Sequence, residues 1–326
     1  MIKLHVLMVS NHWAARAFSP WAGIFVDRQI ASLEKVGVRI SRFDIGRSHS
    51  PIHIAAKSIE LRKLVKRLQP DLVHAQYGTI VSFVSALAGP PLVISFCGSD
   101  LLSGASVSLF RSYSGFFLSN FSALRARRLI CKSEQLRRAL WWRRDRAVVI
   151  PNGIDFDLFS PGSREAARRY LCIDQGSQVV LFNAGSQPGL KGLDVAQEAL
   201  KKVRRQLPNA QLCVVSNVNP EDMPEYYRAA DVLLCASLRE GSPNVVKEAL
   251  ACNLPVISTP VGDVEERLAG VRPSAVVPRD ADAIGAALIE VLLKQERSNG
   301  REKVASLKLE NIAQRILNVY LSVLQR

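Results

Sequence analysis

The sequence contains no apolar run of the roughly 18 residues that a membrane-spanning helix needs, and its opening apolar stretch is too short for a secretory signal. It has six cysteines but no C-x-x-C pair, so neither a disulfide framework nor a zinc site is indicated. Internal repeats and low-complexity tracts are also missing. We therefore expect a cytoplasmic globular protein with reduced, packed cysteines and no metal site.

Acidic residues are scarce in one half of the chain. Residues 1–150 carry 22 Lys/Arg and 8 Asp/Glu, whereas residues 151–326 carry 21 of each, so the net charge of +14 belongs to the first half. Such a basic half can bind nucleic acid, an anionic membrane surface or an acidic acceptor. The chain has no aromatic stacking motif and no helix-turn-helix pattern, which argues against nucleic acid as a partner.

A cluster within the basic half combines arginine with tryptophan, a pairing typical of lipid headgroup regions. The alternative is a solvated helix whose tryptophans face the core. If the first interpretation holds, the protein is peripheral on the inner face of the plasma membrane. The residues of this candidate membrane or acceptor patch are Arg137, Arg138, Trp141, Trp142, Arg143 and Arg144.

At 326 residues the chain is about twice the length of a typical domain. Short apolar runs alternate with helical patterns throughout, which predicts parallel sheets covered by helices on both faces. Pro151-Asn152-Gly153 interrupts the alternation. We predict an α/β fold with two Rossmann-like domains, residues 1–153 and 154–302, whose cleft is the natural ligand site. A final helical segment, 303–326, should return to the first domain.

The expected elements can be stated as ranges. Strands are predicted at 2–9, 38–44, 71–75, 91–96, 128–131 and 147–150, then at 178–184, 211–216, 231–235, 255–258 and 275–277. Helices are predicted at 22–36, 52–68, 79–88, 114–126 and 133–141, then at 163–171, 191–207, 243–252, 280–294 and 303–325. Asp155-Phe156-Asp157 has the spacing of a metal-diphosphate clamp, but it lies in the connector, so we predict a turn there.

The segment 239–250 carries the strongest functional pattern, because it sets Glu240 and Glu248 eight residues apart across a helix start. Ser242 is a good N-cap and Pro243 a good first helical residue, which would leave Glu240 in the preceding loop. The helix amides and the positive end of the dipole then lie between the two acids. This arrangement suits a diphosphate, and acids on either side suit the hydroxyl groups of a nucleotide sugar.

The same pattern taken alone also fits a capped surface helix with solvated acids. Its context favours a ligand site, since the apolar runs 231–236 and 254–258 flank it and complete a βαβ unit. Ligands of such units gather at the carboxyl ends of the strands, where Glu240 would lie.

Several segments together resemble the family 4, group 1 glycosyltransferases, which have two Rossmann-like domains (the GT-B fold) and transfer sugars with retention. The signature of this family is two glutamates separated by seven residues. Matching segments span nearly the whole chain: 71–78, 97–101, 149–155, 191–192, 227–234, 240–248 and 255–258. Within the family, segments 23–28, 240–246 and 261–264 look most like cell-surface polysaccharide enzymes of the teichuronic-acid biosynthesis type.

The resemblance assigns roles to single residues. Glu240 would face the donor sugar near the reacting carbon, Glu248 would hold the ribose, and Lys191 would offer a cation to the diphosphate. Gly23 and the amides at the helix start would complete the anion pocket. The donor-binding set is Gly23, Ser186, Gly241, Ser242, Pro243, Asn244, Val245 and Glu248, and the catalytic pair is Glu240 and Lys191. Taken alone, Lys191 also fits a solvated lysine at a helix start, and Gly23 a simple turn.

The chain departs from the family pattern at two positions. Ser186 stands where an arginine commonly follows Gly185, and Cys97 stands where a histidine commonly precedes Gly-Ser-Asp. One diphosphate partner is therefore missing, and the usual contact near the sugar is in doubt. Cys97 and Asp100 are the residues expected near the sugar or acceptor. We interpret Cys97 as a packing residue, since no histidine partner is evident to activate it.

The expected activity is a metal-independent, retaining transfer from a nucleotide-diphosphate sugar, UDP-linked by the resemblance, to a glycan or lipid-linked acceptor. No cofactor is expected. Two alternatives stay open on the residues. One is a nucleotide-sugar 2-epimerase, which shares the architecture, and the other is a non-catalytic subunit that binds the nucleotide sugar.

Overall fold

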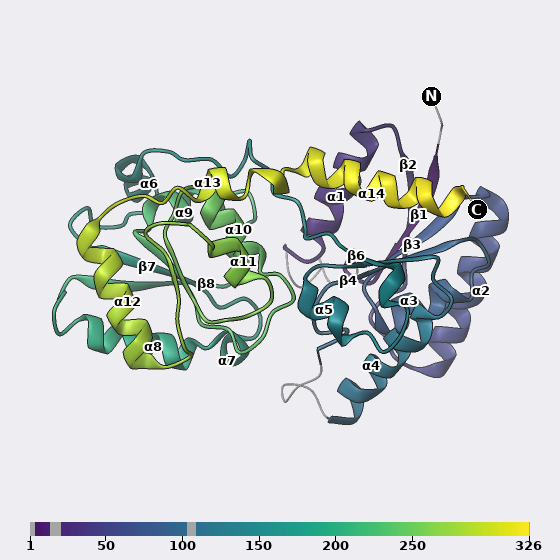
Figure 1. Cartoon of the computed structure of the whole chain (residues 1–326), viewed down its shortest axis with the longest axis horizontal. Helices are drawn as coiled ribbons and strands as arrows, with labels where there is room; N and C mark the ends of the chain where they lie inside the picture. The colour runs from purple at the N-terminus through teal and green to yellow at the C-terminus, as the bar shows by residue number, and fades with distance from the viewer. Residues whose placement is uncertain (1–3, 14–20, 103–108, 326) are drawn as a thin grey trace. The chain divides into compact units, whose positions relative to one another are not determined.

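The computed structural model describes residues 4–13, 21–102 and 109–325, and divides into two compact units (Figure 1). The N-terminal unit comprises residues 1–153 together with 309–326. The C-terminal unit comprises residues 154–308. Each unit has its own parallel sheet and its own hydrophobic core.

The sheet of the N-terminal unit has six parallel strands in the order β2-β1-β3-β4-β5-β6. The strands are β1 His5–Ser10, β2 Arg39–Asp44, β3 Leu72–Gln76, β4 Leu92–Phe96, β5 Arg128–Cys131 and β6 Ala147–Val149. The helices between them are α1 Ile24–Lys35, α2 Pro51–Leu68, α3 Thr79–Ala86, α4 Leu109–Ala123 and α5 Glu134–Ala139. Every residue of β1, β3 and β4 is buried, as expected for strands covered on both faces.

The last helix, α14 Leu309–Leu324, belongs to the N-terminal unit although it follows the whole C-terminal unit in sequence. It packs beside α1. Tyr320 on α14 is fully buried, and its hydroxyl lies 2.6 Å from His74 Nδ1 on β3. Ser322 accepts a hydrogen bond from Arg128 Nε at 3.2 Å. These contacts fasten the chain's end to the first sheet.

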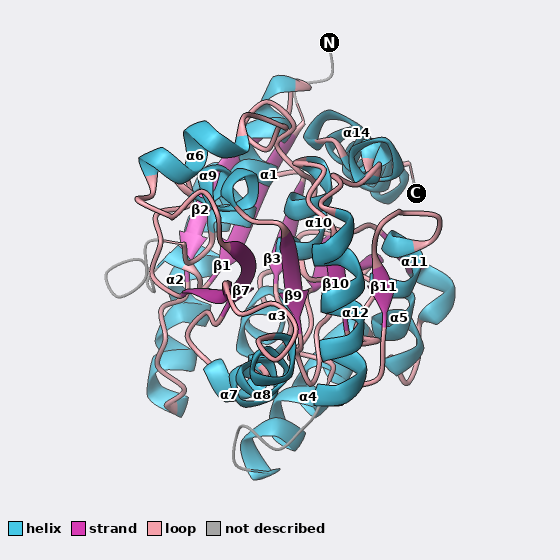
Figure 2. Ribbon diagram, turned by 90° about the vertical axis from the view of Figure 1, so that its left-hand side faces the viewer, coloured by secondary structure: helices cyan, strands magenta, loops and turns pink. Residues whose placement is uncertain are grey.

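The sheet of the C-terminal unit has five parallel strands in the order β11-β10-β9-β7-β8. They are β7 Gln178–Asn183, β8 Ala210–Val215, β9 Val232–Cys235, β10 Val256–Ser258 and β11 Ala275–Val276. Figure 2 shows β7, β9, β10 and β11 side by side in this order. The helices are α6 Arg164–Tyr170, α7 Pro188–Lys191, α8 Leu193–Val203, α9 Met223–Ala229, α10 Asn244–Ala251, α11 Val264–Leu268, α12 Ala281–Lys294 and α13 Gly300–Lys303.

The predicted α/β class with two parallel-sheet units is confirmed, and each predicted strand is present within two or three residues of its expected ends. The helix predicted at 191–207 is wrong in detail, because Gly192 in the left-handed region separates α7 from α8. The helix predicted at 303–325 is interrupted before α14. Asp155 Oδ1 accepts hydrogen bonds from the amides of Asp157 and Leu158, which confirms the predicted turn.

Candidate functional site

The loop between β9 and α10 carries Glu240. Glu240 Oε1 accepts a hydrogen bond from Lys191 Nζ at 2.5 Å and another from Ser237 Oγ at 2.9 Å. The side chains of Glu240 and Lys191 are 18% and 28% exposed, so both charges are largely desolvated yet still accessible. The structure therefore brings together the two residues predicted to be catalytic, which are 49 positions apart in sequence.

Lys191 is positioned by close packing of backbone. It is the last residue of α7, so the prediction from the sequence that it begins a helix is wrong. Gly192 follows with φ +81°, and a Cβ at this position would collide with the carbonyl oxygen of Ala236. The amide of Leu238 donates to the carbonyl of Leu190 at 2.9 Å. The segment around Lys191 is thus fixed against the loop that follows β9.

The electrostatics of this pair favour a permanent cation. Burial alone would lower the pKa of Lys191, but the charge of Glu240 and the hydrogen bond to it outweigh burial and raise the pKa above its ordinary value. Lys191 therefore stays protonated at physiological pH. A fixed, partly accessible ammonium at the carboxyl edge of a parallel sheet is suited to an anionic ligand.

Ser242 does not cap the helix, so the predicted N-cap is wrong. α10 begins at Asn244, and Pro243 occupies the cap position with extended backbone angles. The Ser242 hydroxyl instead donates to Asp263 Oδ2 and accepts from Lys247 Nζ, both at 3.0 Å. The two buried charges hold this hydroxyl more strongly than a helix amide would, because hydrogen bonds to ionised groups are the stronger ones.

The start of α10 is built against the next βα loop. A Cβ at Gly262, which has φ +58°, would lie 2.8 Å from the carbonyl oxygen of Gly241. Pro243, Asn244 and Val245 then lead into the first helical turn. Amides of a first turn have no acceptor within their helix, and they stand at the positive end of its dipole. This end of α10 therefore has the character of an anion site.

Glu248 lies in the second turn of the same helix. It stands four residues beyond the first helical residue, or about 6 Å along the axis. Its Oε2 accepts a hydrogen bond from the hydroxyl of Tyr227 on α9 at 2.9 Å. Tyr227 is itself fully buried, so it fixes the orientation of the carboxylate.

Ser186 lies in the loop after β7 and is exposed. In this loop Asn183 Oδ1 accepts a hydrogen bond from the amide of Gly185 at 3.0 Å. A Cβ at Gly185 would be 3.7 Å from Lys191 Cε, so the loop passes beside the catalytic candidate. Ser186 follows Gly185 in this loop and does not supply the charge of the arginine common in the family pattern.

Sequence reasoning missed three charged residues that shape this site. Lys247 is buried to 1% exposure behind the start of α10, and Asp263 is held by Arg267 Nε at 3.0 Å as well as by Ser242. Arg279 Nε donates to the carbonyl of Ala236 at 3.2 Å. The Gly-Asp pair at 262–263 was the available signal for Asp263. No pattern marks Lys247 or Arg279, because they come from a helix face and a distant loop.

The remaining site candidates belong to the N-terminal unit. Gly23 precedes α1 with φ +73°, and a Cβ there would lie 2.9 Å from His12 Cβ. The glycine is therefore required by both its backbone angle and its neighbour. The ring of His12 packs edge-on against Phe25 and Tyr77, and burial lowers the pKa of His12 to about 4.

Asp100 is fully buried and organises the loop after β4. Its carboxylate accepts hydrogen bonds from the amides of Gly98 at 2.7 Å, Gly78 at 2.8 Å and Cys97 at 3.0 Å. Burial raises the pKa of Asp100, although these amides oppose the shift. Cys97 is partly buried, with Sγ directed at the carbonyl of Ser95. Asp100 thus stabilises the backbone of this loop by accepting hydrogen bonds from its amides, and Cys97 lies beside it.

Comparison with models of known families identifies the family to which this chain belongs. Residues 4–158 match the model described as Glycosyltransferase Family 4, and residues 214–294 match the model described as Glycosyl transferases group 1. The first match lies almost wholly in the N-terminal unit, and the second lies in the C-terminal unit, where it includes the Glu240–Glu248 segment. The chain belongs to the family 4 glycosyltransferases.

Among curated relatives of this glycosyltransferase, a D-inositol 3-phosphate glycosyltransferase from Segniliparus rotundus is 32% identical over 48% of the chain and 42% of its own length. A putative teichuronic acid biosynthesis glycosyltransferase, TuaC of Bacillus subtilis, is 28% identical over 72% of the chain and 65% of its own length. The matches therefore span between two fifths and two thirds of these relatives.

A solved structure shares the fold of the glycosyltransferase over its full length. The Anabaena Alr3699/HepE protein in complex with UDP-glucose superimposes with a TM-score of 0.74 at 17% identity, over 98% of this chain and all of the other. At this identity the likeness establishes the GT-B fold alone.

The residues of the arginine–tryptophan cluster of the glycosyltransferase make different contacts. Arg137 and Arg138 both pair with Glu134, at 2.8 and 3.3 Å. Trp142 packs on the core, and its Nε1 donates to the carbonyl of Asn120 at 2.6 Å. Trp141 is 49% exposed. The alternative of core-facing tryptophans is thus right for Trp142, and Trp141 stays available to a partner.

The other two arginines of the cluster bond to backbone. Arg143 donates to the carbonyl of Leu124 at 3.3 Å, and Arg144 Nε donates to the carbonyl of Leu140 at 2.6 Å. These contacts with the backbone set the orientation of both side chains. No helix within residues 4–13, 21–102 and 109–325 is long and apolar enough to cross a membrane. Over the same residues, no cluster of three or more His, Cys, Asp or Glu is placed to hold a metal.

Proposed function

We propose that this glycosyltransferase moves a sugar from a nucleoside-diphosphate donor, UDP-linked, to a glycan or lipid-linked acceptor of a cell-surface polysaccharide. The observation that carries the proposal is the Lys191–Glu240 pair beside the start of α10, at the carboxyl edge of the second sheet. The fold likeness to a protein that binds UDP-glucose and the likeness to a teichuronic acid enzyme support the donor and the acceptor class.

The proposed chemistry follows from where positive charge is available. As the bond between the sugar's anomeric carbon and the diphosphate breaks, negative charge grows on the departing oxygen. Lys191 and the dipole of α10 are fixed beforehand, so they would stabilise this charge without reorganisation. Glu240 holds Lys191 and would meet the sugar's hydroxyl groups. We propose retention at the anomeric carbon, with the acceptor hydroxyl arriving on the face that the diphosphate leaves.

Replacing the pair tests this mechanism. We expect Lys191→Ala and Glu240→Gln each to lower kcat by about 10²–10³-fold, the loss typical of removing one preorganised charge-stabilising group. The matched control is Lys201→Ala, which removes an exposed lysine paired with Glu198 at 3.0 Å in the same unit. Transfer from a panel of nucleotide sugars would be followed by mass spectrometry. An unchanged kcat for Lys191→Ala would overturn the leaving-group model.

Proton NMR of the same reactions separates the competing functions. The coupling of the product's anomeric proton reports retention or inversion. Isomerised donor in the absence of acceptor would indicate a 2-epimerase. Calorimetry that shows donor binding without any product would indicate a non-catalytic binding subunit, and either result would contradict transfer.

We further propose that the reaction needs no divalent metal, because Lys191 and the start of α10 supply the positive charge a metal would otherwise provide. EDTA should then leave kcat within about twofold of its original value, since the charge-stabilising groups are part of the chain. Added Mg²⁺ or Mn²⁺ should not raise it. A loss of turnover in EDTA that a single metal restores would contradict this proposal.

A further inference from the structure

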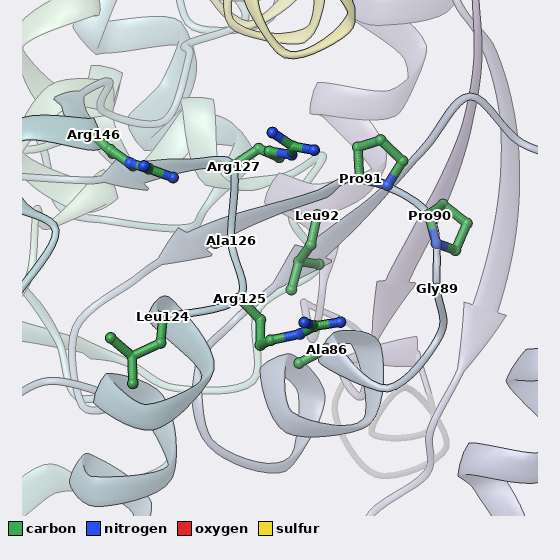
Figure 3. Close-up of a pocket in the computed structure, with 10 residues that line it drawn as sticks. All are labelled: Ala86, Gly89, Pro90, Pro91, Leu92, Leu124, Arg125, Ala126, Arg127 and Arg146. Carbon is green, nitrogen blue, oxygen red and sulfur yellow. The ribbon is translucent and has the colours of Figure 1, made fainter. Parts of the chain in front are cut away.

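A cavity of about 310 Å³ lies in the N-terminal unit (Figure 3). It is at the opposite end of the strands from Cys97 and Asp100, which follow the carboxyl end of β4. It stands at the amino ends of β4, β5 and β6, so it is separate from the site described above. Its lining residues are Ala86, Gly89, Pro90, Pro91, Leu92, Leu124, Arg125, Ala126, Arg127 and Arg146. We call it the arginine pocket.

The arginine pocket is strongly cationic. Three of its lining residues are arginines, and none is acidic: Arg125 and Arg127 come from the segment between α4 and β5, and Arg146 comes just before β6. Within the described part of the chain, the guanidinium groups of Arg125, Arg127 and Arg146 form no ion pair or side-chain hydrogen bond. Asp145 neighbours Arg146 in sequence but pairs with none of them. Three arginines that face one cavity without a counter-charge favour an anionic ligand with several oxygens.

An exposed apolar stripe leads along α4 to this pocket. Phe117, Phe121 and Leu124 are spaced four and three residues apart, so they share one face of the helix and its continuation. They are 54%, 50% and 39% exposed, and Leu124 also lines the pocket. Trp141 packs edge-on against Phe117, with ring centroids 6.0 Å apart. Large apolar side chains gathered on a surface in this way mark an interaction site.

The two features together restrict the ligand. A soluble phosphate would satisfy the arginines but leave the apolar stripe in water. A membrane of anionic lipids supplies both a phosphate layer and an apolar layer beneath it, and aromatic side chains favour that boundary. We propose that the arginine pocket binds the phosphate of an anionic membrane lipid while Phe117, Phe121 and Trp141 enter the headgroup region. This extends the lipid-linked acceptor of the proposed function by naming the docking surface.

Vesicle binding tests the pocket directly. The purified full chain would be sedimented with phosphatidylcholine vesicles, with and without phosphatidylglycerol. We expect binding to the anionic vesicles alone, and the double variant Arg125→Gln/Arg127→Gln should bind about 25-fold more weakly, from about fivefold for each arginine near the surface. The matched control is Arg39→Gln/Arg67→Gln, which removes the same charge from exposed positions in the same unit. It should change binding by about twofold or less, since those arginines line no cavity.

Fluorescence quenching tests whether the apolar stripe on α4 and Trp141 enter the lipid layer. Brominated lipids should quench the fluorescence of the wild type, and Trp141→Phe should abolish most of that quenching. Phe121→Ser should weaken vesicle binding without altering circular dichroism, because Phe121 is half exposed and lies outside the core.

Three outcomes would overturn the proposal. The first is an equal loss of vesicle binding in the control double variant, which would reduce the effect to net charge. The second is glycerol phosphate binding that depends on Arg125 and Arg127 without vesicle binding, which would identify a soluble ligand. The third is preferential binding of the pocket to RNA. Donor binding, measured by calorimetry on the same variants, should be unchanged, so failure of this surface and failure of the proposed transfer are distinguishable.

Discussion

Single residues at the candidate site act through neighbours that the sequence does not reveal. Lys191 and Glu240 were each identified by a motif, but their contact depends on Gly192, which allows the two loops to meet. Ser242 shows the opposite case. Its type and position suit an N-cap, yet Lys247 and Asp263 claim its hydroxyl. The N-cap preference of serine does not decide the structure here, because two buried charged side chains bind the Ser242 hydroxyl in place of a helix amide.

Gly192→Ala should damage both stability and turnover. Alanine at φ +81° would be strained by about 1–3 kcal/mol, and its Cβ would push the carbonyl of Ala236 away, which would move Lys191 from Glu240. Urea unfolding and kcat measure the two effects. The matched control is Gly189→Ala in the same short helix, where φ is not positive and no atom lies within 4 Å of the added Cβ. Equal behaviour of the two variants would contradict the packing argument.

At the scale of elements, the sequence was sufficient to predict strands and long helices. A continuous apolar run such as 232–235 becomes a fully buried strand, because a parallel sheet covered on both faces has no polar side. The short helices α9 and α11 have seven and five residues, too few for a helical period to be visible. The arginine pocket was also beyond prediction, since its members come from three loops that only the sheet brings together.

α14 is tied to β3 by a buried polar contact that predicts acid sensitivity. Burial, assisted by the nearby Lys132 ammonium, lowers the pKa of His74 to about 3, and burial lowers that of His12 to about 4. In the unfolded chain both imidazoles take up protons below their ordinary pKa of 6.5. The unfolded state therefore binds more protons between pH 6.5 and these lower values. As the pH is lowered across this window, the free energy of unfolding should decrease by about 1.4 kcal/mol per pH unit for each histidine.

Urea unfolding at a series of pH values measures this slope. His74→Gln should lower this slope by about half above pH 4, because one of the two imidazoles that take up a proton on unfolding is gone while His12 remains. Tyr320→Phe removes the hydroxyl that contacts His74 but leaves the imidazole, so it should lower stability at every pH while keeping most of the slope. The same slope in His74→Gln as in the wild type would show that His74 is not responsible.

The whole molecule consists of two units that each bury a core of their own. Such chains commonly unfold in more than one transition. The chain offers a direct way to separate the two, because all four tryptophans, at positions 13, 21, 141 and 142, belong to the N-terminal unit. Tryptophan fluorescence therefore reports the N-terminal unit, whereas far-ultraviolet circular dichroism reports both.

UDP should stabilise the C-terminal unit selectively, since Lys191, Glu240, Glu248 and α10 all belong to it. A ligand at about 100 times its Kd adds about 2.7 kcal/mol to the stability of the state that binds it. The circular dichroism transition should therefore shift upward more than the fluorescence transition. The shift should be lost in Lys191→Ala and kept in Lys201→Ala. If UDP raised the fluorescence transition instead, the nucleotide would be held mainly by the N-terminal unit, and the assignment of the donor site to α10 would be wrong.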